Sequence, residues 1–148
     1  MGVRDSKRAN AAAAWRAIFD LIVTTAPGRD AFIKRLGLSP AESRALASLE
    51  PGRGRPMRAL AQEWGCDPSN ATWLVDRLEN HGLVARETVA GDRRIKSVVL
   101  TPAGAKLRAR LVRFFYTPPD LLLELTAGDI AALTRAASRL PTPTRLRE

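Results

Sequence analysis

The side chains best suited to recognise another molecule lie between Pro68 and His81. Asp67 can cap the start of a helix there, and Pro68 fits its first turn. At about 100° per residue, the apolar residues of this segment share one side of the predicted helix and are expected to face the core. They are Ala71, Leu74, Val75 and Leu78.

The opposite side of this helix carries side chains that can contact the edges of nucleic-acid bases. On it or beside it lie Ser69, Asn70, Thr72, Trp73 and Arg77. Asn70 can pair with adenine, Arg77 can bind guanine or a phosphate, and the amides of the first turn favour an anion. The alternative is that Ser69 and Asn70 only satisfy the first turn and that Arg77 pairs with acidic side chains. Trp73 has two interpretations, packing in the groove of DNA or folding back over the preceding helix.

The segments around this helix predict a helix-turn-helix followed by a wing. Residues 57–64 form the preceding short helix, and residues 65–67 form the tight link. Residues 83–89 and 95–100 are rich in β-branched residues and predict a β-hairpin with its turn at 90–94. Arginine at such a tip suits a narrow minor groove. The predicted wing contacts are Asp92, Arg93, Arg94 and Lys96.

The rest of the chain predicts helices, so the expected fold is mainly α (α+β). A first helix covers about 6–25 and ends at Pro27-Gly28, and a second piece covers 30–36. Ser39 and Thr101 cap two further helices, with Arg53–Pro56 as a basic loop after the first of them. Thr126 caps the last helix, and the tail after it is expected to fray. We expect residues 37–101 to form the winged helix-turn-helix, and residues 1–36 and 102–148 to form a helical dimerisation region.

Composition excludes several classes of function. The chain has 148 residues with one cysteine and one histidine, so neither an internal disulfide nor a histidine metal site or catalytic triad is expected. No Gly-rich phosphate loop or useful carboxylate pair is present, so we expect no enzyme, metal or cofactor. A net charge of +9 indicates an anionic partner such as DNA. Without a long apolar run or a signal segment, we expect a cytoplasmic protein with no membrane partner.

Residues 60–104 resemble the MarR family of winged-helix regulators. The resemblance rests on the LVDRLE and GLV run at 74–84, the DRR tip at 92–94 and the VxLTxxG pattern at 98–104. It implies a homodimer on palindromic double-stranded DNA, acting as a repressor that a small aromatic or phenolic effector releases. The candidate effector residues are Trp15, Phe19, Phe32 and Phe115. Trp73 departs from the small, polar or basic residue common at its position, so the bases read by relatives do not transfer.

Two other interpretations stay open. Cys66 could make the protein a redox-sensing regulator, although a small, half-buried turn residue is the simpler interpretation. The winged helix could also be a protein-interaction module without specific DNA binding, in which case DNA affinity would be weak and insensitive to salt.

Overall fold

The computed structural model describes residues 3–89 and 92–141, and for 3–4, 89 and 92–95 it describes the backbone alone. The chain divides into two compact units, Met1–Gly37 and Leu38–Glu148. Among the described residues, no helix is long and apolar enough to cross a membrane.

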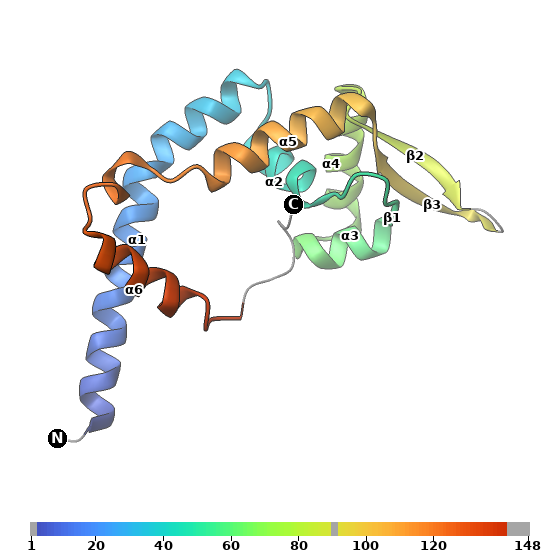
Figure 1. The fold of residues 1–148 in the computed structure, drawn as a ribbon. Coiled ribbons are helices and arrows are strands. Elements are labelled where there is room, and N and C mark those ends of the chain that lie inside the picture. The colour runs from blue at the N-terminus through green and yellow to red at the C-terminus, as the bar shows by residue number, and fades with distance from the viewer. Residues whose placement is uncertain (1–2, 90–91, 142–148) are drawn as a thin grey trace. The chain divides into compact units, whose positions relative to one another are not determined.

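The first unit is a single helix, α1 (Val3–Arg35), drawn in blue in Figure 1. The predicted end at Pro27-Gly28 is wrong, because Pro27 lies inside the helix. Proline removes one backbone N–H, but its fixed φ is itself helical, so the chain can continue at the cost of one hydrogen bond. The turn before it gains a side-chain bond, since the Thr25 hydroxyl donates to the Leu21 carbonyl at 2.9 Å.

The second unit holds five α-helices among the described residues, with a short 3₁₀ turn before the last of them (Figure 1). They are α2 (Pro40–Ser48), α3 (Met57–Trp64), α4 (Pro68–Asn80), α5 (Pro102–Tyr116), the 3₁₀ turn η1 (Asp120–Leu122) and α6 (Ala127–Ala137). The predicted caps of α2, α5 and α6 are confirmed, since Ser39, Thr101 and Thr126 each accept a hydrogen bond from an amide of the first turn.

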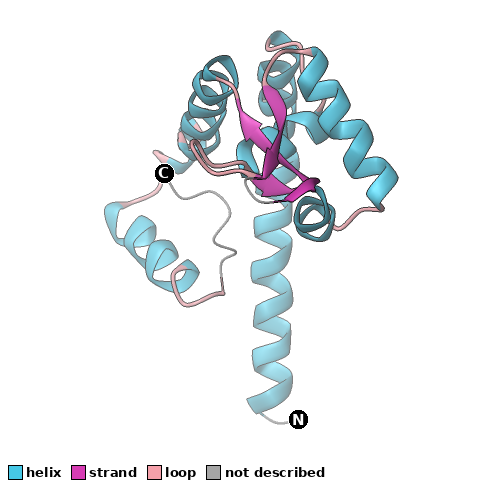
Figure 2. Cartoon of the chain, turned by 90° about the vertical axis from the view of Figure 1, so that its right-hand side faces the viewer, coloured by secondary structure: helices cyan, strands magenta, loops and turns pink. Residues whose placement is uncertain are grey.

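A three-stranded antiparallel sheet follows the order β1-β3-β2. Its strands are drawn in magenta in Figure 2. Its strands are β1 (Arg55–Pro56), β2 (Val84–Val89) and β3 (Asp92–Leu100). The predicted basic loop is therefore partly wrong, because Arg55 pairs with Val98 of β3. Two residues that include a proline carry no strand pattern, and they become a strand only because β3 offers a free edge. The mainly helical fold with a wing hairpin is confirmed.

The core of the second unit is aliphatic. The large aliphatic side chains with no exposed surface or almost none come from four of its helices, the residue that follows α2, and two strands: Leu46, Leu49, Leu60, Val75, Leu78, Val84, Val98 and Leu111. Helix α4 packs against α2, α3 and β2, so its orientation is set from three sides.

At Gly104, α5 lies directly against the backbone of Leu83, the residue before β2. A Cβ at this position would lie 1.8 Å from the Leu83 carbonyl oxygen, far inside contact distance. The carbonyl of Leu83 also accepts the Thr101 N–H at 3.0 Å. The glycine of the VxLTxxG pattern is therefore required by backbone packing rather than by a left-handed conformation.

We predict that Gly104→Ala lowers the free energy of unfolding by about 1–3 kcal/mol, because the backbone must shift to admit the methyl group. Chemical denaturation followed by circular dichroism measures the change. The matched control is Gly128→Ala in the first turn of α6, where the nearest atom lies 3.7 Å away. Since alanine favours helix, the control is expected to be neutral or more stable by up to about 1 kcal/mol. Equal denaturation midpoints for Gly104→Ala and wild type would contradict the close approach.

Candidate nucleic-acid interface

The turn between α3 and α4 is built around Gly65. Its φ of 60° and ψ of 38° place it in the left-handed region, which glycine adopts without strain. The Cys66 N–H donates to the Ala61 carbonyl at 3.1 Å and closes the end of α3. Asp67 occupies the N-cap position of α4 with extended backbone, but its side chain makes no capping hydrogen bond, contrary to expectation. The first amides of α4 are therefore not satisfied by this side chain.

Helix α4 presents the predicted side to solvent. Ala71, Val75 and Leu78 are fully buried, and Leu74 is half-buried. All five predicted contact residues of this helix are exposed: Ser69, Asn70, Thr72, Trp73 and Arg77. The predicted sidedness of the helix is therefore confirmed. The DNA contacts themselves stay a prediction.

Trp73 is 55% exposed, which is unusual for the largest apolar side chain. The guanidinium carbon of Arg77 lies 6.0 Å from its ring centroid, within range of a cation–π contact. The exposed indole and the adjacent cation thus form one continuous surface on α4.

Arg77 is tied to a buried carboxylate of α2. Its Nε donates to Glu42 Oε1 at 3.0 Å, and the Glu42 side chain is only 2% exposed. The other carboxylate oxygen, Oε2, accepts the Ser39 N–H at 2.7 Å as part of a capping box. His81 Nε2 lies 3.6 Å from Oε1. The expectation that Arg77 could pair with acids is thus confirmed, and Glu42 is a partner that sequence reasoning missed.

The environment of Glu42 favours its ionised form. Burial by itself raises the pKa of this carboxyl, but hydrogen bonds with Ser39 and the hydrogen bond and charge of Arg77 together hold the pKa below its ordinary value. Glu42 is therefore a permanent anion at neutral pH, and it keeps one side of the Arg77 guanidinium occupied.

The two acids of α4 share one arginine of β2. Arg86 forms ion pairs with Asp76 through Nη2 and with Glu79 through Nη1. Its backbone N–H also donates to Glu79 Oε1 at 3.3 Å. This cluster links β2 to α4, and the single positive charge of Arg86 offsets one of the two negative charges that would repel a phosphate backbone.

The wing itself is the β2–β3 hairpin. Lys96 is exposed and lies opposite Thr88 in the pairing of the two strands. Strand β3 begins at Asp92, so the backbone of residues 92–94 belongs to the strand and not to the turn predicted at 90–94. Extended pairing of Val89 with Asp92 continues the ladder past the irregularity at Thr88. The side chains of Asp92, Arg93 and Arg94 lie outside the described residues, and their DNA contacts stay predictions.

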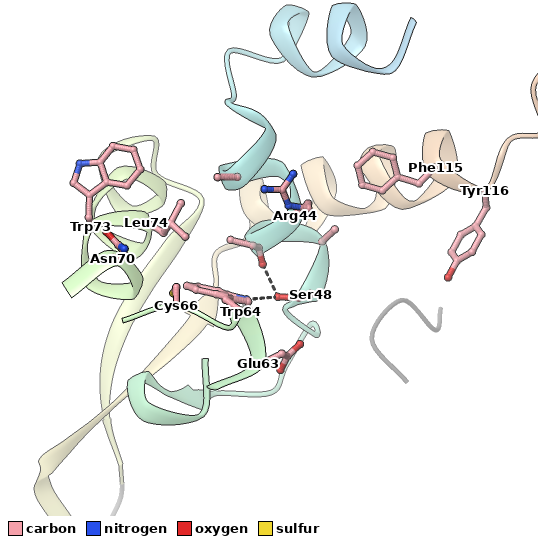
Figure 3. Close-up of a pocket in the computed structure, with 13 residues that line it drawn as sticks. Arg44, Ser48, Glu63, Trp64, Cys66, Asn70, Trp73, Leu74, Phe115 and Tyr116 are labelled. Carbon is pink, nitrogen blue, oxygen red and sulfur yellow. Dashed lines mark hydrogen bonds between the residues drawn. The ribbon is translucent and has the colours of Figure 1, made fainter. Parts of the chain in front are cut away.

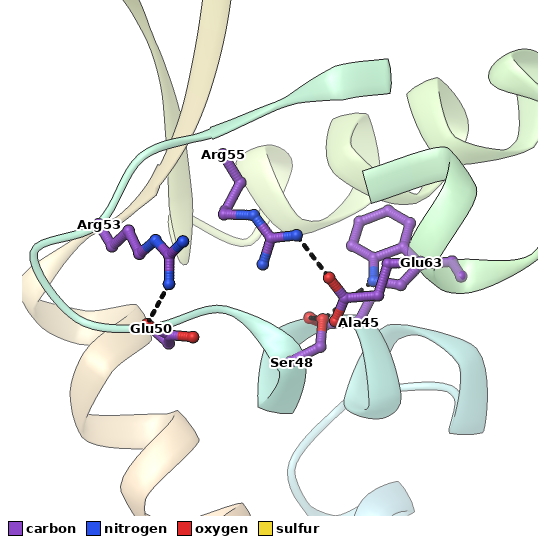
Figure 4. A network of polar contacts seen from close by, with 7 residues as sticks. Ala45, Ser48, Glu50, Arg53, Arg55 and Glu63 are labelled. Atoms are coloured by element: carbon purple, nitrogen blue, oxygen red, sulfur yellow. Dashed lines mark hydrogen bonds and ion pairs between the residues drawn. The ribbon is translucent and has the colours of Figure 1, made fainter. Parts of the chain in front are cut away.

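The arginines before α3 are held by acids, as Figure 4 shows. Arg53 pairs with Glu50 at 3.1 Å, and Arg55 of β1 pairs with Glu63 of α3 at 2.6 Å. Beside them, Trp64 Nε1 donates to the Ser48 hydroxyl at 2.9 Å. The Arg55–Glu63 pair joins β1 to α3 and the Trp64–Ser48 bond joins α3 to α2, whereas the Arg53–Glu50 pair is an exposed contact within the loop after α2.

A cavity of about 750 Å³ lies among α2, the α3–α4 turn and the end of α5 (Figure 3). Its aromatic wall comes from Trp64, Trp73, Phe115 and Tyr116. Its polar wall includes Arg44, Ser48, Glu63 and Asn70, and Cys66 also borders it. The cavity therefore shares two residues, Asn70 and Trp73, with the predicted DNA-contact side of α4.

Of the four predicted effector residues, the structure places Phe115 on this cavity. Trp15 is 62% exposed on α1 and packs near Phe19, with ring centroids 6.4 Å apart. Phe32 is half-buried beneath the Arg35 guanidinium. Sequence reasoning missed Arg44 and Trp64, since nothing along the chain places α2 and α3 around one cavity. Across the part of the chain that is described, no cluster of three or more His, Cys, Asp or Glu could hold a metal ion.

Comparison with known proteins identifies one family of transcription regulators. Residues 36–95 match the model of the MarR family. The HTH-type transcriptional repressor MdtR of Bacillus subtilis (strain 168) is 33% identical over 72 residues, which are 49% of this chain and 46% of MdtR. The match thus spans about half the length of this curated relative.

Two crystal structures share the fold. The YusO protein from Bacillus subtilis has a TM-score of 0.68 and 22% identity, over 94% of this chain and 96% of YusO. The S. aureus MepR–DNA complex has a TM-score of 0.59 and 22% identity, over 87% of this chain and 99% of MepR.

We predict that Glu42→Gln lowers the free energy of unfolding by about 1–2 kcal/mol at neutral pH, because it removes a charge-assisted hydrogen bond. The expected loss is kept small because the Arg77 side chain is half exposed and solvent screens the pair. A carboxylate with a lowered pKa stabilises the fold above its unfolded pKa and loses this effect as the pH falls through the folded value. The difference from wild type should therefore shrink below about pH 4.3. Denaturant titrations across this pH range measure it.

Glu50→Gln is the control, since Glu50 forms an exposed pair with Arg53. Its effect should stay within about 0.5 kcal/mol at every pH. A Glu42→Gln difference that does not depend on pH would contradict the role of the charge.

Proposed function

The chain belongs to the MarR family of winged helix-turn-helix transcription regulators, which are not enzymes, and we propose that it represses transcription by binding double-stranded DNA as a homodimer. The proposal places α4 in the major groove and the β2–β3 wing beside it, in the adjacent minor groove. Two relatives support it, since MdtR is named a transcriptional repressor and MepR is described in complex with DNA.

The observation that carries the proposal is the division of α4 into two sides. Its apolar residues are buried, while Ser69, Asn70 and Thr72 are exposed near its start. Short polar side chains at that end of a recognition helix are in position to reach base edges. The acids farther along, Asp76 and Glu79, are paired with Arg86, so they oppose the approach of DNA less.

Exposed apolar residues support the homodimer. On α1, Trp15, Ile18, Phe19, Ile22 and Val23 are all exposed. On α6, Ile130 and Leu133 are exposed as well. Apolar stripes of this extent on terminal helices are typical of surfaces that a second copy covers. A two-fold dimer would read two half-sites about one helical turn apart.

The cavity beside α4 supports control by a small effector. A volume of about 750 Å³ suits a small molecule, and the lining combines aromatic side chains with Arg44. We propose an aromatic or phenolic ligand there that weakens DNA binding, because Asn70 and Trp73 would serve both ligand and DNA. Trp15, Phe19 and Phe32 stay as further candidates from α1.

Selection of bound duplexes from random DNA tests the function, and a two-fold symmetric sequence is the expected result. On that sequence, Asn70→Ala should relax the preference at one base of each half-site. Arg94→Ala should weaken binding to all sequences. It should also lower the slope of log K against log salt by the amount expected for about one phosphate contact. Arg53→Ala serves as a control, since Arg53 is paired with Glu50. Unchanged affinity in both test variants would show that a different surface binds DNA, and salt-insensitive weak binding would favour a protein-interaction module.

Thermal shift with a panel of aromatic acids and phenols tests the effector. At least one compound should raise the melting temperature by a few degrees and also weaken DNA binding. Phe115→Ala should abolish the shift if the ligand occupies the cavity, whereas Trp15→Ala should abolish it if α1 holds the ligand. A flat response across the panel would count against an effector of this class.

A further inference from the structure

We propose that Glu42, which lies on α2 and outside the DNA-contact side, is a positioning residue for DNA binding: it holds Arg77 through Nε so that the two terminal nitrogens of the guanidinium bind a DNA phosphate. The inference rests on the proposed function, because it assigns a role within DNA binding.

The two ends of the Arg77 guanidinium have different surroundings. Nε lies 3.0 Å from Glu42 Oε1, on the buried side. The Arg77 side chain as a whole is 48% exposed. Within the described part of the chain, Nη1 and Nη2 make no hydrogen bond or ion pair. Two parallel donors of a guanidinium match the oxygens of a phosphate, which makes this the favoured ligand.

The carboxylate that holds Arg77 is itself held in place. Glu42 Oε2 accepts the Ser39 N–H at 2.7 Å, and the Glu42 N–H donates to the Ser39 hydroxyl at 3.2 Å. This capping box locks both the backbone and the side chain of Glu42 at the start of α2. An arginine held by such a group has lost much of its rotamer freedom before DNA arrives, so less entropy is lost on binding.

Other ion-paired arginines in the described structure are engaged differently. Arg86 uses Nη1 and Nη2 for Glu79 and Asp76, so its terminal nitrogens are occupied. Arg55 uses Nη2 for Glu63. Arg77 is paired through Nε, and it lies on the exposed side of α4 next to Trp73. The contrast favours a structural role for Arg86 and Arg55 and a ligand-binding role for Arg77.

The sign of the charge makes the proposal testable. Glu42→Gln removes a negative charge near the proposed DNA surface, so long-range electrostatics alone predicts equal or tighter binding. Positioning of Arg77 predicts weaker binding, because the guanidinium regains its freedom. The two explanations therefore differ in direction and not only in size.

The experiment measures the affinity of the full-length protein for a mixed-sequence DNA duplex over a range of salt concentrations, well below the melting temperature of each variant. Arg77→Ala is expected to weaken binding about tenfold and to lower the slope of log K against log salt by about 0.9. Glu42→Gln is expected to weaken binding about fivefold in the wild-type background and to have no effect in the Arg77→Ala background. Glu50→Gln, which removes an equal charge from an exposed pair, is expected to bind as wild type or slightly more tightly.

Two results would overturn the proposal. One is a Glu42→Gln variant that binds as tightly as wild type or more tightly. The other is a Glu42→Gln effect that persists in the Arg77→Ala background, since that would indicate a general structural effect.

If Glu42→Gln does not fold, Arg77→Lys tests the proposal instead. Lysine keeps the positive charge but has no Nε to pair with Glu42 and no second terminal nitrogen to bind phosphate. Wild-type affinity in this variant would also reject the proposal. A wild-type protein that does not bind the duplex would instead disprove the proposed function, and this inference with it.

Discussion

Burial of one side of α4 is the interaction on which the candidate interface depends. Ala71, Val75 and Leu78 have no exposed surface, and they are packed from α2, α3 and β2. Packing from three sides fixes the rotation of the helix about its axis, so the polar side chains between the apolar ones must face outward. The exposure of Ser69, Asn70 and Thr72 is therefore a consequence of core packing, and a change in the core would alter the interface.

Ion pairs then determine which charges on this surface remain available. The net charge of +9 suggests a uniformly basic protein, yet Arg53, Arg55 and Arg86 are each bound to acids. These pairs join β1 to α3 and β2 to α4, and they hold the elements of the winged helix together. The exposed Arg53–Glu50 pair adds little stability, whereas the largely buried Arg55–Glu63 pair helps to hold β1 against α3.

The same helix connects the interface to the cavity. Trp73 belongs to the exposed side of α4, contacts Arg77 and forms part of the cavity wall (Figure 3). Arg77 in turn is held by Glu42 of α2, the helix whose Ala41 and Arg44 also line the cavity. A molecule in the cavity would thus contact both helices that position Arg77. This arrangement is the physical basis of the proposal that a small effector controls DNA binding.

The sequence by itself determined the elements and the sidedness of α4, because helix caps, glycine stops and apolar periodicity are local signals. Ser39 and Thr101 were identified in this way, and the bounds of α3 followed from such signals. Local rules failed at Pro27, where the helix continues, and at β1, where pairing needs the edge of β3.

Only the tertiary structure decided the partners. The Arg77–Glu42 pair spans 35 positions, and the cavity gathers side chains from four helices. Such contacts depend on how elements pack in three dimensions, and spacing along the chain carries no record of that packing.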